Sequence, residues 1–324
     1  MPLTADPPAA VTLDDVRAAA RTLDGIVVRT PLVEVPALSD LAGVPVALKC
    51  EQLQPIGAFK VRGAYNAISR AAAAGARGIV TQSSGNHGQA VAWAARAFGL
   101  RAVVVMPEST PRIKVDGVRR HGGEVVFAGA IRSPEQGQRA EAIARQDGLV
   151  MIPPFDHPDV VAGQGTIGLE IAEQRPDVAV VLSPVSGGGL LAGITVAISA
   201  LKPQARIVAV EPAGAAKLSA ALAAGEPRTL QRTESMADGL LTRSIGSFTF
   251  PIIRRVVREA VQVAEDEIAA AVRFLHHEAG LRVEPSGAVT TAAVLAGRVR
   301  LDGPAVLVVS GGNVDPELFQ RLAE

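Results

Sequence analysis

Apolar residues recur along the chain in two patterns that alternate with each other. Apolar runs of about 4–8 residues, which are typical of buried strands, are separated by longer segments with helical spacing. The predicted strands are 44–50, 78–81, 102–107, 124–128, 178–185, 206–211 and 305–310, and the predicted helices are 62–74, 88–98, 113–121, 133–146, 165–173, 190–201 and 265–279. Strands that alternate with helices indicate an α/β fold whose parallel sheets are covered on both faces.

The domain organisation follows from the chain length and from the absence of a linker. A chain of 324 residues is long enough for about two domains, yet no segment rich in proline or serine divides it. We therefore expect two interleaved domains. Residues 1–60 and 152–324 would form the larger one, and residues 61–151 a smaller one that swings to close a site. Thr12, followed by Asp15, predicts a capping box at the start of a first helix.

Composition narrows the class of protein. Apolar residues make up 48% and charged residues 20% of the chain, which excludes a disordered or fibrous protein. The 32 basic and 32 acidic residues give zero net charge, and no basic cluster points to nucleic acid. A single cysteine, Cys50, excludes a disulfide framework and a cysteine-rich metal site. Membrane-length apolar runs and a signal pattern are both absent, so we expect a cytoplasmic protein without a membrane partner.

Lysine is rare in this chain, and one lysine lies in an unusual setting. The five lysines are Lys49, Lys60, Lys114, Lys202 and Lys217. Lys60 lies in the segment PIGAFKVRGA, near the predicted start of a helix. Burial and the positive end of the helix dipole both lower the pKa of an amine at this place, which favours the neutral form that a Schiff base requires. The alternative is a lysine on the exposed face of an amphipathic helix.

Three further turns follow predicted strands and are built from glycine and small polar residues. They are SSGNHG at 83–88, SGGGL at 186–190 and SGGNV at 310–314. Backbone N–H groups at the start of a helix bind carboxylate or phosphate, and consecutive glycines allow an anion to approach the backbone closely. Helix capping at 83–88 and an ordinary turn at 310–314 are the alternatives.

The glycine-rich turn after the strand at 178–185 has a second interpretation. The spacing of Gly187, Gly189 and Gly193 fits a dinucleotide-binding fingerprint, and Glu211 lies at the end of the next strand, where an acidic residue would bind ribose. An NAD-dependent oxidoreductase is therefore a distant alternative, which leaves Lys60 and the turn at 83–88 unexplained.

Taken together, these segments resemble the fold-type II pyridoxal-phosphate enzymes of the threonine dehydratase, serine dehydratase and serine racemase family. Seven segments occur in the family's order: PIGAFKVRGA, SSGNHG, PFDHPDVVAGQGTIGLEI, PVSGGGLLAGI, ADG, EPSGAV and SGGNVD. The resemblance covers residues 14–321. It implies a tryptophan synthase β-like fold, with two three-layer α/β/α domains, mostly parallel sheets and the cofactor in the cleft. It also implies the short form without a regulatory domain, and a homodimer.

The resemblance assigns roles to individual residues. Lys60 would hold pyridoxal 5′-phosphate covalently and act as the base at the substrate Cα. The cofactor-binding residues would be Phe59, Lys60, Asn86, Ser186, Gly187, Gly188, Gly189, Leu190, Glu284 and Ser310, with Asn86 at the phenolic oxygen and Ser310 at the pyridine nitrogen. The residues that bind the amino-acid substrate would be Ser83, Ser84, Gly85, Asn86, His87 and Gly239.

The residue at the pyridine nitrogen bears on the reaction type. A serine hydroxyl there makes the ring a weaker electron sink than a carboxylate would, which favours prompt loss of a β leaving group. We expect β-elimination from a β-hydroxy L-amino acid, threonine or serine, to a 2-oxo acid and ammonia. Ser84, acting opposite Lys60, would instead support a racemase. Arg132 or Arg243 would favour a second carboxylate on the substrate, as in a hydroxyaspartate dehydratase.

One departure from the family concerns a metal site. Metal-dependent relatives bind a cation through a glutamate, a backbone carbonyl four residues later and an acidic residue six residues later. These positions are Glu211, Ala215 and Lys217 here. Because an ammonium group would stand where the cation binds, we expect no divalent metal and a pairing of Lys217 with Glu211. The alternative is that Lys217 points into solvent.

Overall fold

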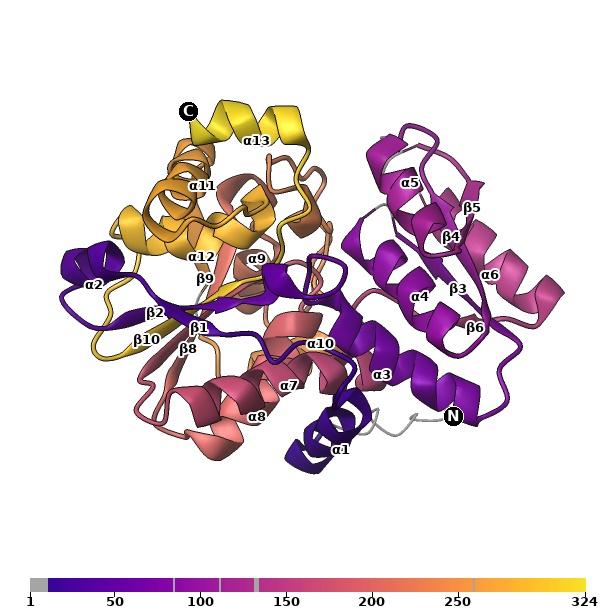
Figure 1. The fold of residues 1–324 in the computed structure, drawn as a ribbon, viewed down its shortest axis with the longest axis horizontal. Helices are drawn as coiled ribbons and strands as arrows, with labels where there is room; N and C mark the ends of the chain where they lie inside the picture. Colours follow the sequence, from indigo (N-terminus) through magenta and orange to yellow (C-terminus); the bar gives the residue numbers. More distant parts are fainter. Residues whose placement is uncertain (1–10, 84, 111, 131–133, 259) are drawn as a thin grey trace.

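Two α/β domains with mostly parallel sheets make up the fold, as the sequence predicts. The computed structural model describes residues 11–83, 85–110, 112–130, 134–258 and 260–324. One sheet has six strands in the order β1-β2-β10-β7-β8-β9, and the other has four in the order β5-β4-β3-β6. The two sheets and their helices lie side by side (Figure 1). Among the described residues, every strand pair is parallel except β1 with β2.

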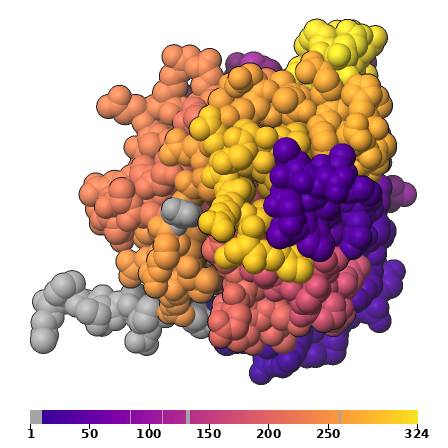
Figure 2. Space-filling view, turned by 90° about the vertical axis from the view of Figure 1, so that its left-hand side faces the viewer, coloured from indigo at the N-terminus to yellow at the C-terminus, as the bar shows by residue number. Residues whose placement is uncertain are grey.

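The six-stranded domain combines the N-terminal segment with the C-terminal half of the chain. Its strands are β1 (Leu32–Glu34), β2 (Val46–Cys50), β7 (Val180–Pro184), β8 (Arg206–Pro212), β9 (Ala260–Val263) and β10 (Ala305–Val309). Figure 2 shows the consequence at the surface, where an indigo N-terminal patch lies against yellow C-terminal residues. This contact follows from the sheet order, because β2 pairs with β10 from the far end of the chain.

Helices cover both faces of this sheet because successive strand residues point to opposite faces. Val181 and Ile207 belong to the cluster under one face, whereas Leu182 and Val208 belong to the cluster under the other. The first face carries α1 (Leu13–Leu23), α7 (Pro158–Gln174), α8 (Gly189–Leu201), α9 (Lys217–Ala224) and α10 (Thr249–Ile253). The second carries α2 (Pro36–Ala42), α11 (Glu265–Ala279), α12 (Pro285–Leu295) and α13 (Pro316–Ala323).

The four-stranded domain has the same layered construction. Its strands are β3 (Gly78–Gln82), β4 (Arg101–Met106), β5 (Glu124–Phe127) and β6 (Val150–Met151), and its helices are α4 (Asn86–Ala97), α5 (Arg112–Arg120) and α6 (Glu135–Asp147). The helix α3 (Lys60–Ala73) packs against both α4 and α7, so it links the two domains. The division at residues 60 and 152 stays a prediction.

Local signals in the sequence explain several element boundaries. Thr12 and Asp15 form the predicted capping box at the start of α1. The helix α7 begins at Pro158, seven residues before the predicted start, because His157 caps it and proline is favoured in the first turn. The strands β1 and β6 were not predicted because they have only three and two residues, and the four-residue strand β9 was missed as well. None of the helices in the described part of the chain is long and apolar enough to cross a membrane.

The strand ends bring the predicted functional segments together. In parallel sheets of this kind, ligands bind beyond the carboxyl ends of the strands. The segments after β3, β7 and β10 are the three turns at 83–88, 186–190 and 310–314 that the sequence analysis singled out. A short bridge between Ala58 and Gly311 places the segment before Lys60 against the turn after β10.

Candidate active site

Lys60 is the first residue of α3 and is half-buried. Its Nζ donates a hydrogen bond of 2.7 Å to the backbone oxygen of Pro154 and lies 5.1 Å from the centre of the Phe59 ring. Burial lowers the pKa of this amine to about 8, although the Glu284 carboxyl acts in the opposite direction. Lys60 therefore reaches its neutral, nucleophilic form at a lower pH than an exposed lysine does.

A row of polar side chains connects the two domains beside Lys60. Asn86, the first residue of α4, donates 2.9 Å from Nδ2 to Oε1 of Glu284. Asn313 donates 2.9 Å to Oδ1 of Asn86 and 2.7 Å to the backbone oxygen of Ile56. Burial and the charge of Asp238 raise the pKa of Glu284 to about 8, against the hydrogen bond from Asn86. The row fixes the amide of Asn86 in a defined orientation.

The turn after β7 is built for close approach to the backbone. Gly188 has a left-handed backbone conformation (φ 97°), and a Cβ atom there would lie 2.7 Å from Oγ1 of Thr249. A Cβ atom on Gly187 would lie 2.4 Å from the ring of Phe155. Thr249 also donates 2.8 Å to the backbone oxygen of Gly187, which fixes the turn. Because α8 begins at Gly189, its first N–H groups lack intrahelical acceptors and can bind an anion.

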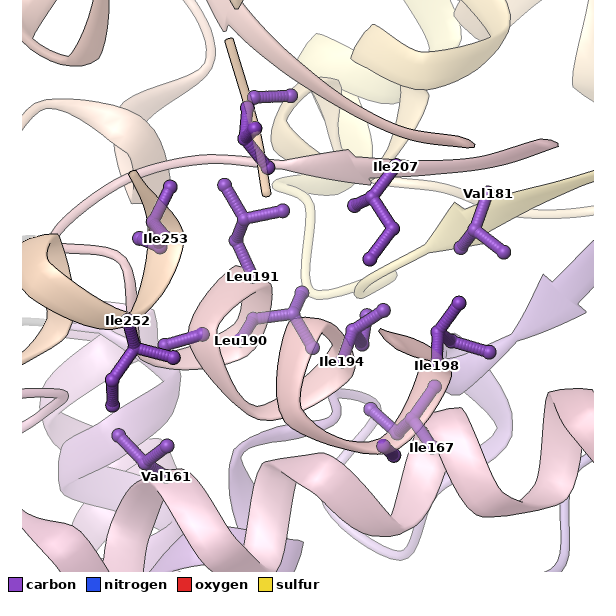
Figure 3. Close-up of a cluster of buried hydrophobic side chains, with 14 of the residues drawn as sticks. Val161, Ile167, Val181, Leu190, Leu191, Ile194, Ile198, Ile207, Ile252 and Ile253 are labelled. Carbon is purple, nitrogen blue, oxygen red and sulfur yellow. The ribbon is translucent and has the colours of Figure 1, made fainter. Parts of the chain in front are cut away.

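The core beneath this turn holds α8 in place. Leu190, Leu191, Ile194 and Ile198 of α8 point into a cluster of apolar side chains from the sheet and the neighbouring helices (Figure 3). The side chain of Leu190 therefore points into the core, so its predicted role in cofactor binding would use its backbone N–H group. Ser186, at the start of the turn, lies 3.2 Å from Oγ1 of Thr242 through its hydroxyl oxygen.

Ser310 and Gly239 meet at the start of α12. The Ser310 hydroxyl donates 3.4 Å to the backbone oxygen of Ser286, and the Gly239 N–H donates 2.9 Å to Oγ of Ser286. The backbone oxygen of Ser310 accepts a 3.1 Å hydrogen bond from the Phe59 N–H. These contacts bring together three residues that the sequence analysis assigned to one site.

The segment after β3 leads into α4, which begins at Asn86. The Gly85 N–H lies 3.3 Å from the hydroxyl oxygen of Ser83, while Ser84 lies outside the described residues. His87 is buried, and its Nε2 donates 3.1 Å to the backbone oxygen of Ile152. Burial, together with the charge of Lys60, lowers the pKa of His87 to about 3, so the imidazole is neutral. The His87 imidazole is thus a buried neutral group whose Nε2 is bound to the Ile152 backbone.

Lys217 is fully buried, so the alternative that it points into solvent is wrong. Its Nζ donates 2.9 Å to the backbone oxygen of Ala215 and 2.8 Å to that of Leu240, and lies 4.0 Å from the Glu211 carboxylate. Burial lowers the pKa of this amine to about 8, against the attraction of Glu211. The ammonium group thus lies beside two of the groups that bind the cation in metal-dependent relatives, the Ala215 backbone oxygen and the Glu211 carboxylate. Independence from divalent metal stays a prediction.

Glu211 is committed to the start of α9. Its two carboxylate oxygens accept hydrogen bonds of 2.9 Å from the N–H groups of Leu218 and Ser219, and Oε1 also accepts 2.7 Å from the Ser219 hydroxyl. These contacts occupy the carboxylate that a dinucleotide-binding interpretation would assign to ribose. Of the two arginines considered for a second substrate carboxylate, Arg243 donates 2.8 Å to the backbone oxygen of Leu230, and Arg132 lies outside the described residues.

The sequence analysis assigned no role to several residues that border the site. Pro154 and Phe155 contact Lys60 and the glycine turn, and Asn313 orients Asn86. All three lie in segments that carried the family resemblance, which was the available signal. Asp238 lies in the ADG segment, but its partner Lys114 lies in none of the seven.

The assembled residues fit pyridoxal phosphate. An amine with a lowered pKa stands beside an aromatic ring, a crowded glycine turn leads into a helix N-terminus, and a buried serine hydroxyl and an oriented amide lie nearby. The amine fits the aldehyde of the cofactor, and the glycine turn at the helix N-terminus fits its phosphate. The aromatic ring, the serine hydroxyl and the amide fit its planar heterocycle.

Comparison with known proteins agrees with this fit. L-threonine ammonia-lyase of Thermotoga maritima is 41% identical over 96% of this chain and 78% of its own length. Serine racemase of Arabidopsis thaliana is 40% identical over 89% of this chain and 88% of its own length. The structure of maize serine racemase superposes with a TM-score of 0.92 at 34% identity, over 97% of each chain. The predicted fold type is thereby confirmed.

The family model described as "Pyridoxal-phosphate dependent enzyme" matches residues 23–311. This range includes Lys60, Asn86, the glycine turn and Ser310. The dinucleotide interpretation is therefore wrong, since it would assign the same glycines to another cofactor. The chain belongs to the family of pyridoxal-phosphate-dependent enzymes.

Proposed function

We propose that this enzyme is an ammonia-lyase that eliminates water from a β-hydroxy L-amino acid, with L-threonine or L-serine as the substrate. L-Threonine would yield 2-oxobutanoate and ammonia, and L-serine would yield pyruvate and ammonia. The observation that carries the proposal is the Lys60 amine, with its pKa lowered to about 8, beside Phe59 and the domain-bridging Asn86–Glu284 contact. The relatives named L-threonine ammonia-lyase support the same reaction.

The roles of the chain's own residues follow from their positions. When bound, the cofactor supplies an electron-withdrawing group that stabilises negative charge at the substrate Cα. Lys60 would hold it and, once displaced by the substrate amine, would take the proton from Cα. The N–H groups at Gly187–Gly189 would bind the phosphate, and Asn86 would orient the ring. The backbone after β3 would bind the substrate carboxylate, so that the scissile Cα–H bond faces Lys60.

Ser310 bears on the choice between reactions. Its hydroxyl lies 3.4 Å from the backbone oxygen of Ser286, and it is a neutral group. A neutral partner leaves the bound ring less electron-deficient than a carboxylate would, so departure of the β-hydroxyl as water competes well with return of the proton to Cα. This supports elimination as the main reaction.

Amino-acid racemisation is the second candidate function. It is favoured by the similarity to serine racemases of Arabidopsis thaliana and maize, which is about as high as the similarity to the lyases. Racemisation requires a second acid–base group on the face of the substrate opposite Lys60, and Ser84 was the residue predicted for this role.

We also propose that the enzyme is a homodimer and that it is located in the cytoplasm. Light scattering tests the homodimer, and cell fractionation tests the location.

The experiment that separates the candidates is a partition measurement. Purified holoenzyme is given L-threonine, L-serine, their D-enantiomers and threo-3-hydroxyaspartate. The 2-oxo acid, ammonia and enantiomer ratio are followed together. We expect equal amounts of oxo acid and ammonia from L-threonine or L-serine. Formation of the D-enantiomer without oxo acid would establish a racemase, and product from hydroxyaspartate alone would establish the dicarboxylate alternative.

A further inference from the structure

An ion pair between Lys114 and Asp238 joins the two domains. Lys114 lies on α5 of the four-stranded domain, and Asp238 begins the short helix η3 (Asp238–Leu240) of the six-stranded domain. The two residues are 124 positions apart in sequence. The side chain of Lys114 is 28% exposed and that of Asp238 is 52% exposed, so the pair is accessible to solvent and can open and close without disturbing a core.

The turn that begins at Asp238 borders the proposed site. The Gly239 N–H is bound by the Ser286 hydroxyl, and the backbone oxygen of Ser286 accepts from Ser310. The charge of Asp238 raises the pKa of Glu284 and that of Lys114 lowers it, so both charges lie within electrostatic reach of the carboxyl that Asn86 contacts. The pair is therefore close to the groups that bridge the domains.

The far end of the turn is anchored in its own domain. Nζ of Lys217, which is fully buried, donates 2.8 Å to the backbone oxygen of Leu240. With Ser286 holding Gly239 at 2.9 Å, the turn is fixed at two of its three residues by groups of the six-stranded domain. The side chain of the remaining residue, Asp238, is then the group through which the turn contacts α5.

We propose that Lys114 and Asp238 are positioning residues whose ion pair holds the four-stranded domain against the Asp238–Leu240 turn while substrate is bound. This inference rests on the proposed function, because it places the substrate between the segment after β3 and Gly239. For a ligand that binds only the closed arrangement, the apparent Kd is the intrinsic Kd divided by the closed fraction of the protein. A smaller closed fraction therefore weakens binding. Loss of the pair therefore weakens substrate binding more than it slows turnover by saturated enzyme.

A kinetic experiment on the holoenzyme tests this split. Lys114→Gln and Asp238→Asn are each expected to raise KM for L-threonine or L-serine about three- to fivefold, the range of an exposed ion pair, with little change in kcat. Lys114→Arg keeps the charge and is expected to restore KM. The double variant is expected to be no worse than either single one, because both remove the same interaction. Arg112→Gln, which removes an ion pair within α5 itself, is the matched control.

Four kinetic results would overturn the proposal, and the first three concern KM. One is an unchanged KM in Lys114→Gln. Another is a double variant in which the KM increases of Lys114→Gln and Asp238→Asn add in full. A third is an Arg112→Gln variant whose KM rises as much as that of Lys114→Gln. A uniform loss of kcat without a change in KM would also overturn it, because that pattern indicates a damaged catalytic site rather than weaker closure.

A second readout does not depend on turnover. A water-soluble carbodiimide joins an ammonium and a carboxylate in contact as an amide, and takes up the water that is lost. We expect peptide mass spectrometry of the treated holoenzyme to find the Lys114–Asp238 link, at higher yield with bound L-alanine, which has no β leaving group. Absence of the link, or a yield that bound L-alanine does not change, would overturn the proposal. The link with its L-alanine response, in a protein inactive on threonine and serine, would support the pair and refute the proposed function.

Discussion

Lys60 owes its chemical character to contacts that come from other parts of the chain. Its position at the start of a helix could be read from the glycine before it and from the helical pattern after it. The acceptor for its amine, the backbone oxygen of Pro154, lies 94 residues away, and its titratable neighbour Glu284 lies still further along the chain, at the start of α12. A lone sequence motif cannot show either contact, so the lowered pKa was an expectation that needed the folded chain.

Replacement of this lysine tests its role. Lys60→Ala is expected to lower kcat by about 10²- to 10⁴-fold, because the variant lacks the amine that holds the cofactor and takes the Cα proton. It is also expected to lose the visible absorbance of the bound cofactor. The matched control is Lys202→Ala. Lys202 lies at the end of α8, and its only described side-chain hydrogen bond is an exposed one to the backbone oxygen of Pro176. Full activity in Lys60→Ala would contradict the assignment.

The Glu284 carboxyl makes stability depend on pH. Its pKa is raised from 4.5 to about 8, so the folded chain binds this proton more tightly than the unfolded chain does. The stabilisation is fully present below pH 4.5 and is lost as the pH rises to about 8. The Tm of the cofactor-free Glu284→Gln variant is therefore expected to fall less steeply with pH over this interval than the Tm of the wild type. The exposed Glu108→Gln is the control, and equal slopes for Glu284→Gln and wild type would refute the assignment.

Lys217 provides the test of metal independence. Activity of the wild type is expected to be unchanged by a chelator and by added Mg²⁺, because the ammonium group already donates hydrogen bonds to the backbone oxygens of Ala215 and Leu240. Lys217→Met is expected to lower the free energy of unfolding by about 3 kcal/mol, since it leaves the buried Glu211 carboxylate without its cation. The measurement is denaturant unfolding beside the chelator assay. Stimulation of the wild type by Mg²⁺ would disprove the idea.

At the scale of elements, the sequence predicted every described helix of nine or more residues except α12, and it missed the shorter helices α2, α9, α10 and α13. The helix α12 escaped prediction because its residues from Pro285 to Val294 are all buried, so no polar face marks the helical period. The edge strand β1 has only three residues and pairs antiparallel, which leaves no pattern to detect. In contrast, α1 and α11 were predicted well because each combines a polar face with acidic residues in its first turn.

The turn between β7 and α8 allows a test with a built-in comparison. Gly188→Ala is expected to destabilise the protein by about 1–3 kcal/mol and to weaken cofactor retention, because a left-handed alanine would also crowd Thr249 at 2.7 Å. Gly225 has a similar positive φ at the end of α9, but its Cβ position is open. Gly225→Ala is therefore expected to affect stability alone. Equal cofactor dissociation rates in the two variants would contradict an anion-binding role for the turn.

At the scale of the whole molecule, the site is assembled from both domains and from both ends of the chain. The order of elements indicated parallel sheets, and the family resemblance indicated which turns share a site. The partners themselves were not predictable, because the contacts of Asn86 with Glu284 and of Lys114 with Asp238 join segments more than a hundred residues apart. Such pairings depend on how the two sheets lie against each other, which the local pattern of one sequence does not encode.

The most direct test of the central claim is chemical trapping of the cofactor. Reduction of the holoenzyme with borohydride converts the bond between pyridoxal phosphate and its lysine into a stable amine, and peptide mass spectrometry then locates it among the five lysines of the chain. We predict that the modification lies on Lys60 alone, and that treatment with L-threonine before reduction diminishes it. Modification of Lys49, Lys114, Lys202 or Lys217 in its place, or of none of the five, would contradict the account.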